Sequence, residues 1–64
     1  MKVGQTIRRL REARHLSQVA LAKRAKVGRV TLVRIEQGTQ DPTVTTLERL
    51  AKALRVNVRD LFPG

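Results

Sequence analysis

The fold is decided by residues 16–38, which read LSQVALAKRAKVGRVTLVRIEQG. Ser17 is a good helix N-cap, because its hydroxyl oxygen can accept a free backbone N–H from the first turn that follows. The sequence therefore predicts a short helix over residues 18–24. The apolar residues that recur at helical spacing are expected to face inward: Leu21, Ala22 and Ala25.

A second helix is predicted after a turn at residues 26–28, and it should end near Gln37. Gly38 then stands where a helix C-cap needs the left-handed backbone conformation, which glycine adopts without steric cost. On a helical wheel Leu32 and Ile35 point towards the core. Two short helices joined by a tight turn thus form the centre of the predicted fold.

Another helix is predicted before this pair, over roughly residues 4–14, because Val3, Ile7 and Leu10 recur at helical spacing. After the pair, residues 39–42 are expected to form a loop. The reason is the proline at the end of this segment, since proline drives the residue before it out of helical geometry.

Two more helices are predicted in the remaining chain. Thr43 is placed to cap the first of them, whose apolar face should carry Val44, Leu47, Leu50, Ala51 and Leu54. A break at residues 56–57 precedes a short fifth helix with Val58, Leu61 and Phe62. Residues 1–64 are therefore expected to form one compact all-α domain of five helices. Without cysteine, its stability must come from helix packing.

The composition indicates a polyanionic partner. Lys and Arg number 14 against five Asp and Glu, which gives a formal net charge of +9. Self-repulsion at this charge density is usually offset by a partner such as nucleic acid, whereas a margin of solubility rarely needs so large an excess. Phe62 is the only aromatic residue. Its isolation favours double-stranded DNA, because RNA and single strands are usually bound by stacking on aromatic side chains.

Several function classes are disfavoured by the residues that the chain lacks. It has no cysteine, a single histidine, His15, and scattered acidic residues, so we expect no enzyme, cofactor, metal site or small-molecule substrate. No apolar stretch of membrane-spanning length, signal-peptide pattern or lipidation motif is present, so we expect no membrane contact and a cytoplasmic location. A cationic membrane-surface peptide would need one long helix, which Gly38 and Pro42 interrupt.

One set of residues, all in register, matches a known pattern: Leu16-Ser17-Gln18, Leu21-Ala22, Val27, Leu32, Ile35-Glu36, Gly38, Pro42-Thr43, Thr46-Leu47, Leu50-Ala51, Ala53-Leu54 and Leu61-Phe62. In these residues the chain resembles the phage-repressor and Cro-like family of helix-turn-helix proteins, also called the XRE family. The resemblance implies five helices, of which the second and third form the DNA-binding unit and the third enters the major groove. It also implies a bacterial or phage-encoded protein that acts at the nucleoid.

Base edges are expected to be read by the face of the third helix that points away from the core, which carries Arg29, Val30, Val33 and Arg34. Arginine can donate two hydrogen bonds to guanine O6 and N7, and valine methyl groups can pack on the thymine methyl. A phosphate contact is an equal alternative for Arg34. The alternative for both arginines is a solvated surface, and for the two valines it is a protein–protein contact.

A second set of residues is expected to contact DNA phosphates: Arg11, Ser17, Gln18, Gln37, Thr39 and Gln40. Gln18 opens a helix, where free N–H groups and the helix dipole attract anions, and the resemblance implies that a glutamine here holds the DNA backbone. The resemblance also implies a structural ion pair between Arg11 and Glu36. The alternatives for Arg11 are a pair with Glu12 and a phosphate contact.

Three positions depart from the family pattern. Relatives commonly carry glycine where this chain has His15 and Lys26, at helix ends with left-handed backbone. Each is expected to cost about 1 kcal/mol relative to glycine. Gly28 replaces the Ser or Thr that usually caps the recognition helix, so this helix end should be more mobile.

We therefore expect sequence-specific binding of double-stranded DNA by a transcriptional repressor. A homodimer on a palindromic operator is expected because a lone small domain makes few phosphate contacts. Residues 56–62 are the predicted dimer surface, with half-sites roughly 10 base pairs apart from centre to centre. The alternatives are an antitoxin or restriction-control protein with a protein partner, and a protein-interaction module that does not bind DNA.

Overall fold

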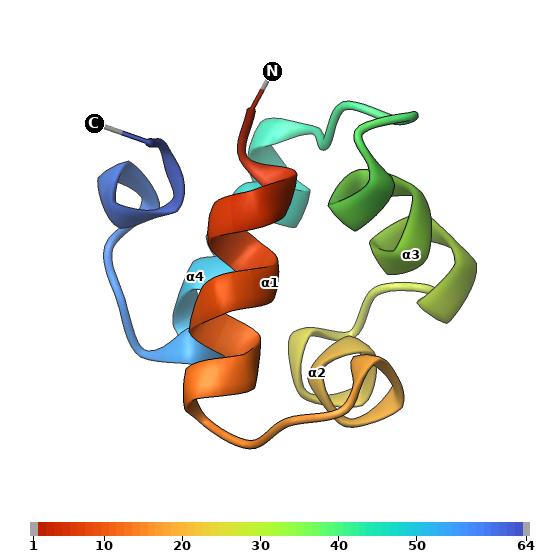
Figure 1. Ribbon diagram of the computed structural model, residues 1–64, viewed down its shortest axis with the longest axis vertical. Coiled ribbons are helices and arrows are strands. Elements are labelled where there is room, and N and C mark those ends of the chain that lie inside the picture. Colours follow the sequence, from red (N-terminus) through yellow and green to blue (C-terminus); the bar gives the residue numbers. More distant parts are fainter. Residues whose placement is uncertain (1, 64) are drawn as a thin grey trace.

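The computed structural model describes residues 2–63, which form four α-helices and one turn of 3-10 helix (Figure 1). The elements are α1 (Gly4–Ala13), α2 (Gln18–Ala25), α3 (Arg29–Gln37), α4 (Val44–Leu54) and η1 (Val58–Leu61). No β-strand occurs in this part of the chain. The all-α class is confirmed, and the four α-helices lie where periodicity and capping residues predicted them.

The prediction of a fifth helix after residues 56–57 is wrong as regards an α-helix, because Val58–Leu61 forms only a 3-10 turn of four residues. The backbone N–H of Asn57 donates to the Asp60 carboxylate at 2.9 Å, which closes this short turn. Phe62 lies beyond it with extended backbone, and Pro63 follows at once, so no room is left for α-helical hydrogen bonds. The domain has four α-helices rather than five.

A single hydrophobic core lies where the helices meet. In Figure 1, α1 crosses in front of α4, while α2 and α3 lie on one side of this pair and η1 on the other. The fully buried large side chains come from every element: Val3, Ile7, Leu21, Leu32, Ile35, Leu50, Leu54 and Leu61. Each contributes about 1.5–3 kcal/mol on burial, which is the main stabilisation available to a domain without disulfides.

Gly4 is the point of closest approach between α1 and α3. A Cβ atom at this position would collide with the backbone carbonyl oxygen of Ile35 and would crowd Glu36. The first turn of α1 therefore rests directly on the last turn of α3. This requirement for glycine was not foreseen from the sequence, because it depends on how the two helices dock.

Basic side chains occupy left-handed backbone positions at three helix ends: His15 (φ 55°), Lys26 (φ 58°) and Arg55 (φ 59°). The first two were predicted, and the third was not. Gly38 has φ 81°, as expected for the C-cap of α3. The left-handed conformation crowds the Cβ atom, so it is sterically disfavoured for these three residues, whereas glycine adopts it freely.

Candidate nucleic-acid interface

The start of α2 is fixed by a side-chain cap. The Ser17 hydroxyl accepts the backbone N–H of Ala20 at 3.0 Å, which confirms the predicted N-cap. Gly28 begins α3 with extended backbone and no side-chain cap, also as predicted. None of the four α-helices has an acidic residue in its first turn. The positive ends of α2 and α3 are therefore not offset by a carboxylate from their own first turns.

The exposed side of α3 carries the residues that were predicted to face bases. Arg29 and Arg34 are exposed, and neither side chain makes a hydrogen bond or ion pair to any residue between 2 and 63. Val30 is 61% exposed, whereas Val33 is half-buried at the edge of the same face. This helix thus presents two unengaged guanidinium groups beside valine methyl groups.

An ion pair joins α1 to α3. Arg11 Nε donates to Glu36 Oε2 at 2.8 Å, and a second guanidinium nitrogen donates to Glu36 Oε1 at 3.0 Å. Arg11 also donates to the carbonyl oxygen of Leu16 at 2.8 Å, in the segment before α2. The hydrogen bond to Glu36 raises the pKa of Arg11 above its ordinary value and outweighs the opposing effect of burial. The Glu36 side chain is only 3% exposed, so this pair is largely shielded from water.

Gln18 belongs to the same network. Its side-chain amide donates to Glu36 Oε1 at 3.1 Å, so one carboxylate holds α1, α2 and α3 together. We predicted a phosphate contact for Gln18 and did not foresee this bond. The residue is half-buried at the first position of α2, where its backbone N–H and amide oxygen lie outside the network.

A hollow of about 370 Å³ opens over this network. It is lined by Arg8, Arg11, Gln18, Val33, Glu36 and Gln37. The structure thus brings together side chains from three helices that the sequence assigned partly to bases and partly to phosphates. A DNA backbone beside α3 would find cationic and amide groups in this hollow.

The loop after α3 carries the last two predicted phosphate contacts, Thr39 and Gln40. Both are exposed. The Thr39 hydroxyl already donates to the carbonyl oxygen of Arg34 at 3.2 Å, where it satisfies the end of α3. The backbone N–H of Thr39 donates to the same carbonyl oxygen. Thr39 can therefore donate to a phosphate only after one of these two bonds breaks.

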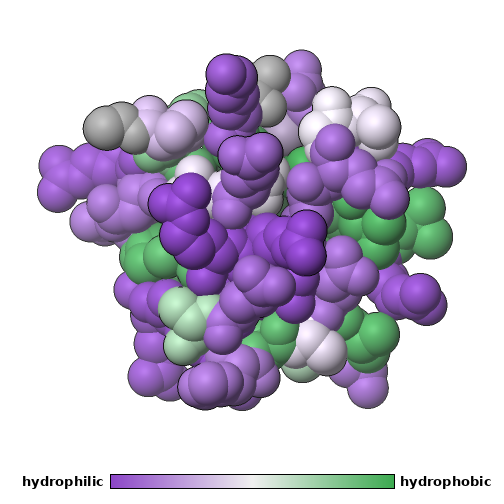
Figure 2. All heavy atoms as spheres, viewed as in Figure 1, coloured by the Kyte–Doolittle hydropathy of each residue, from purple (hydrophilic) through white to green (hydrophobic). Residues whose placement is uncertain are grey.

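The described residues offer neither a metal-binding cluster nor a membrane-spanning helix. Residues 2–63 contain no group of three or more His, Cys, Asp or Glu side chains that could hold a metal ion. No helix among them has the length and hydropathy needed to cross a membrane. Figure 2 shows a largely hydrophilic surface, with a hydrophobic patch at the right-hand edge beside α3.

Comparison with known proteins gives a consistent result. Residues 7–61 match the family described as "Helix-turn-helix". The chain is 43% identical over 58 residues to the immunity repressor protein of Bacillus phage phi105, an alignment that covers 91% of this chain. The chain spans only 40% of the length of that repressor.

Two solved structures have a similar fold. The restriction-modification controller protein C.AhdI from Aeromonas hydrophila superposes with a TM-score of 0.92 at 36% identity, over 95% of this chain and 92% of that protein. SinR, the master regulator for biofilm formation, was solved in complex with DNA. It superposes with a TM-score of 0.89 at 33% identity, over 92% of this chain and 95% of that one.

Proposed function

This chain belongs to the helix-turn-helix family, and we propose that it is a transcriptional repressor that binds a specific double-stranded DNA sequence with α3 in the major groove. DNA-binding transcriptional regulation is supported by the phage repressor and by the two structural neighbours. The proposal includes a binding role rather than a catalytic one, exerted on cytoplasmic DNA.

The observation that carries this proposal is that the two arginine side chains of α3 are exposed and form no hydrogen bond or ion pair within residues 2–63. Arg11 is fully engaged in the ion pair with Glu36, whereas Arg29 and Arg34 have no partner in residues 2–63. Leaving two guanidinium groups exposed beside the apolar Val30 gives the fold no stability. Such groups fit base edges, because arginine can bind guanine and valine can contact thymine.

The phosphate contacts are proposed around this helix. The N-terminus of α2 with Gln18 and the hollow beneath it are suited to one strand of the backbone. Gln37 and Gln40 are suited to the backbone at the other end of α3, whereas Thr39 would contact a phosphate only after one of its two bonds to Arg34 breaks. In this arrangement the network around Glu36 sets the distance between phosphate and base contacts.

A homodimer on a palindromic operator forms part of the proposal. The predicted dimer surface at residues 56–62 is smaller than expected, because Leu61 is fully buried in the core. Phe62 is 41% exposed and Val58 is half-buried beside it, so the apolar contact must centre on Phe62.

Restriction control is the second candidate function. It is favoured by the similarity to C.AhdI, which this chain matches over 92% of that controller's length. The same DNA-binding surface would serve either role. A binding site in the promoter of an adjacent restriction endonuclease gene would favour control, and a site in a phage or unrelated promoter would favour general repression.

The test is selection of binding sites from random duplexes with the purified protein. We expect enrichment of one motif with inverted symmetry, in which Arg29→Ala relaxes the preference at one base pair of each half-site. Enrichment of no motif, with equal binding of all duplexes, would contradict sequence-specific recognition. Enrichment of a motif without inverted symmetry would contradict only the dimer.

A further inference from the structure

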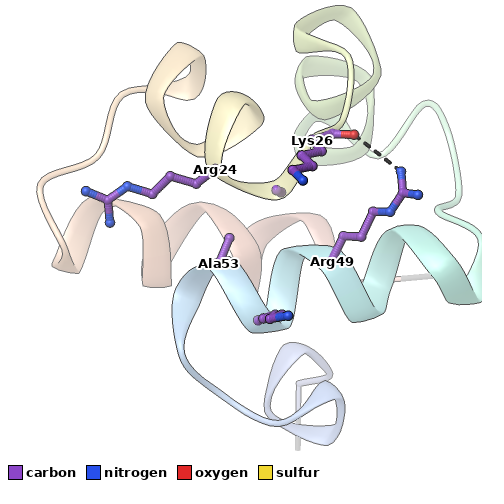
Figure 3. Close-up of a pocket in the computed structure, with 6 residues that line it drawn as sticks. Arg24, Lys26, Arg49 and Ala53 are labelled. Carbon is purple, nitrogen blue, oxygen red and sulfur yellow. Dashed lines mark hydrogen bonds between the residues drawn. The ribbon is translucent and has the colours of Figure 1, made fainter.

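A second cationic surface lies between α2 and α4, apart from the residues predicted to contact bases or phosphates. The last turn of α2 and the middle of α4 enclose a groove of about 530 Å³, lined by Arg24, Ala25, Lys26, Arg49, Lys52 and Ala53 (Figure 3). Four of these six residues are cations, all of them exposed, and no carboxylate lines the groove. The two alanines leave its floor shallow and without large apolar side chains.

One cation of the groove, Arg49, is held in place by a hydrogen bond. Arg49 donates to the backbone carbonyl oxygen of Lys26 at 3.3 Å, which fixes one guanidinium group against the turn between α2 and α3. Figure 3 shows Arg49 at one end of the groove and Arg24 at the other. Lys26, whose carbonyl oxygen accepts this bond, is the C-cap of α2 and has left-handed backbone geometry.

The position of the groove relates it to DNA. The turn at residues 26–28 leads directly into the N-terminus of α3, where Arg29 is exposed. A duplex that lies along α3 continues past this end of the helix, next to the turn that carries Lys26. On this basis, which rests on the proposed function, we propose that the groove binds the phosphate backbone of DNA that flanks the operator half-site.

Phosphate fits this groove better than an acidic protein segment does. Protein interfaces usually depend on a large side chain buried in a pocket, and here the floor offers only the methyl groups of Ala25 and Ala53. A row of flexible cations along an open groove suits a chain of regularly spaced phosphates, whose binding releases counterions. Flanking contacts of this kind add affinity and depend on no base sequence.

The test uses the selected operator in two lengths, one trimmed to the half-sites and one extended by about 10 base pairs, one helical turn, on each side. The groove variant is Arg24→Gln/Lys52→Gln, because neither side chain makes a hydrogen bond within residues 2–63. The control is Arg9→Gln/Arg14→Gln, which removes the same charge at exposed positions of α1 and its C-cap, outside the groove and outside residues 56–62. Thermal melts establish that both variants fold, and Arg49→Gln is added to the groove variant in a second step.

Wild type and control are expected to bind the extended duplex more tightly than the trimmed one, and the groove variant is expected to bind both equally. Arg24 and Lys52 of the two protomers would make four phosphate contacts, and at about 0.9 each in the salt slope their contribution should fall roughly 100-fold between 50 and 200 mM salt, so the length effect should fade over this range. If the groove variant keeps the full length effect, the groove does not bind flanking DNA and faces another partner, such as an acidic protein segment.

The same measurements separate this inference from the proposed function. Loss of the length effect together with an intact preference for operator over random duplex supports both. If wild type has no preference for the operator but its length effect disappears in the groove variant, the proposed operator recognition is wrong and the phosphate groove stands.

Discussion

Gln18 and Glu36 are joined by a hydrogen bond of 3.1 Å, which ties the first residue of α2 to the last turn of α3. Arg11 donates to the same carboxylate from α1. The helix that is proposed to grip the DNA backbone and the helix that is proposed to read bases are therefore set relative to each other by one side chain.

Glu36→Gln should destabilise the domain by about 3 kcal/mol, because Arg11 then remains in a largely dry site without its counter-charge. The free energy of unfolding in urea measures this loss. In the double variant with Arg11→Met the cost should be clearly less than the sum of the two single variants, since each removes the same pair. Additive costs would mean that the two residues do not act together.

Gly4→Ala should destabilise the fold by about 1–3 kcal/mol, because the new Cβ collides with the Ile35 carbonyl and forces α1 away from α3. Gly28→Ala is the matched control. A Cβ there meets only Thr31, at 3.5 Å or more, so no collision is expected and the cost should stay at or below about 1 kcal/mol, that of alanine in place of glycine at a helix N-cap. Thermal melts of the two variants measure this difference. Equal shifts in melting temperature would show that Gly4 is not a contact point.

Arg29→Ala should lose roughly 1–3 kcal/mol of binding on the preferred site and much less on random duplex, because a base contact acts only where its base is present. Salt titrations on both duplexes measure this. If Arg29→Ala weakens both equally and lowers the salt slope by about one unit, Arg29 contacts a phosphate instead.

Gln18→Ala should weaken binding to operator and random duplex by a similar factor, since a phosphate contact carries no sequence information. The salt slope should stay nearly constant, because glutamine is uncharged. The structure adds a second effect: this variant also loses the bond to Glu36, so its stability should be measured beside its affinity. A loss confined to the operator would instead make Gln18 part of base recognition.

Phe62→Glu should weaken self-association about tenfold or more, because hiding the exposed part of a phenylalanine is worth about 1–2 kcal/mol. Binding to a single half-site should be unchanged. Sedimentation with and without the palindromic duplex distinguishes the two effects. A variant that still binds the duplex as a pair with wild-type affinity would place the dimer contact elsewhere.

The helices could be predicted from the sequence because their signals are local. Ser17 and Thr43 cap the helices that they precede: their hydroxyl oxygens accept the backbone N–H groups of Ala20 at 3.0 Å and of Thr46 at 3.1 Å. The last element was overestimated, since three apolar residues at helical spacing fit a 3-10 turn equally well. Apolar spacing alone does not tell one short helical form from the other.

The arrangement of the site was harder to predict, because it depends on residues far apart in the chain. The bond from Gln18 to Glu36 and the collision point at Gly4 exist only once α1, α2 and α3 are docked. The basic groove likewise joins Lys26 to Arg49 across two helices. Periodicity places each of these residues on a face of its own helix, but it does not say which face of another helix it meets.

The left-handed backbone at the helix ends makes this domain less stable than it would be with glycine at these positions. Glycine at His15 or Arg55 should raise the melting temperature, since each substitution removes steric strain of about 1 kcal/mol. Neither residue lines the cationic groove or the hollow over Glu36. A more thermostable form could therefore be engineered without altering the DNA-binding surfaces, whereas the same change at Lys26 would exchange affinity for stability.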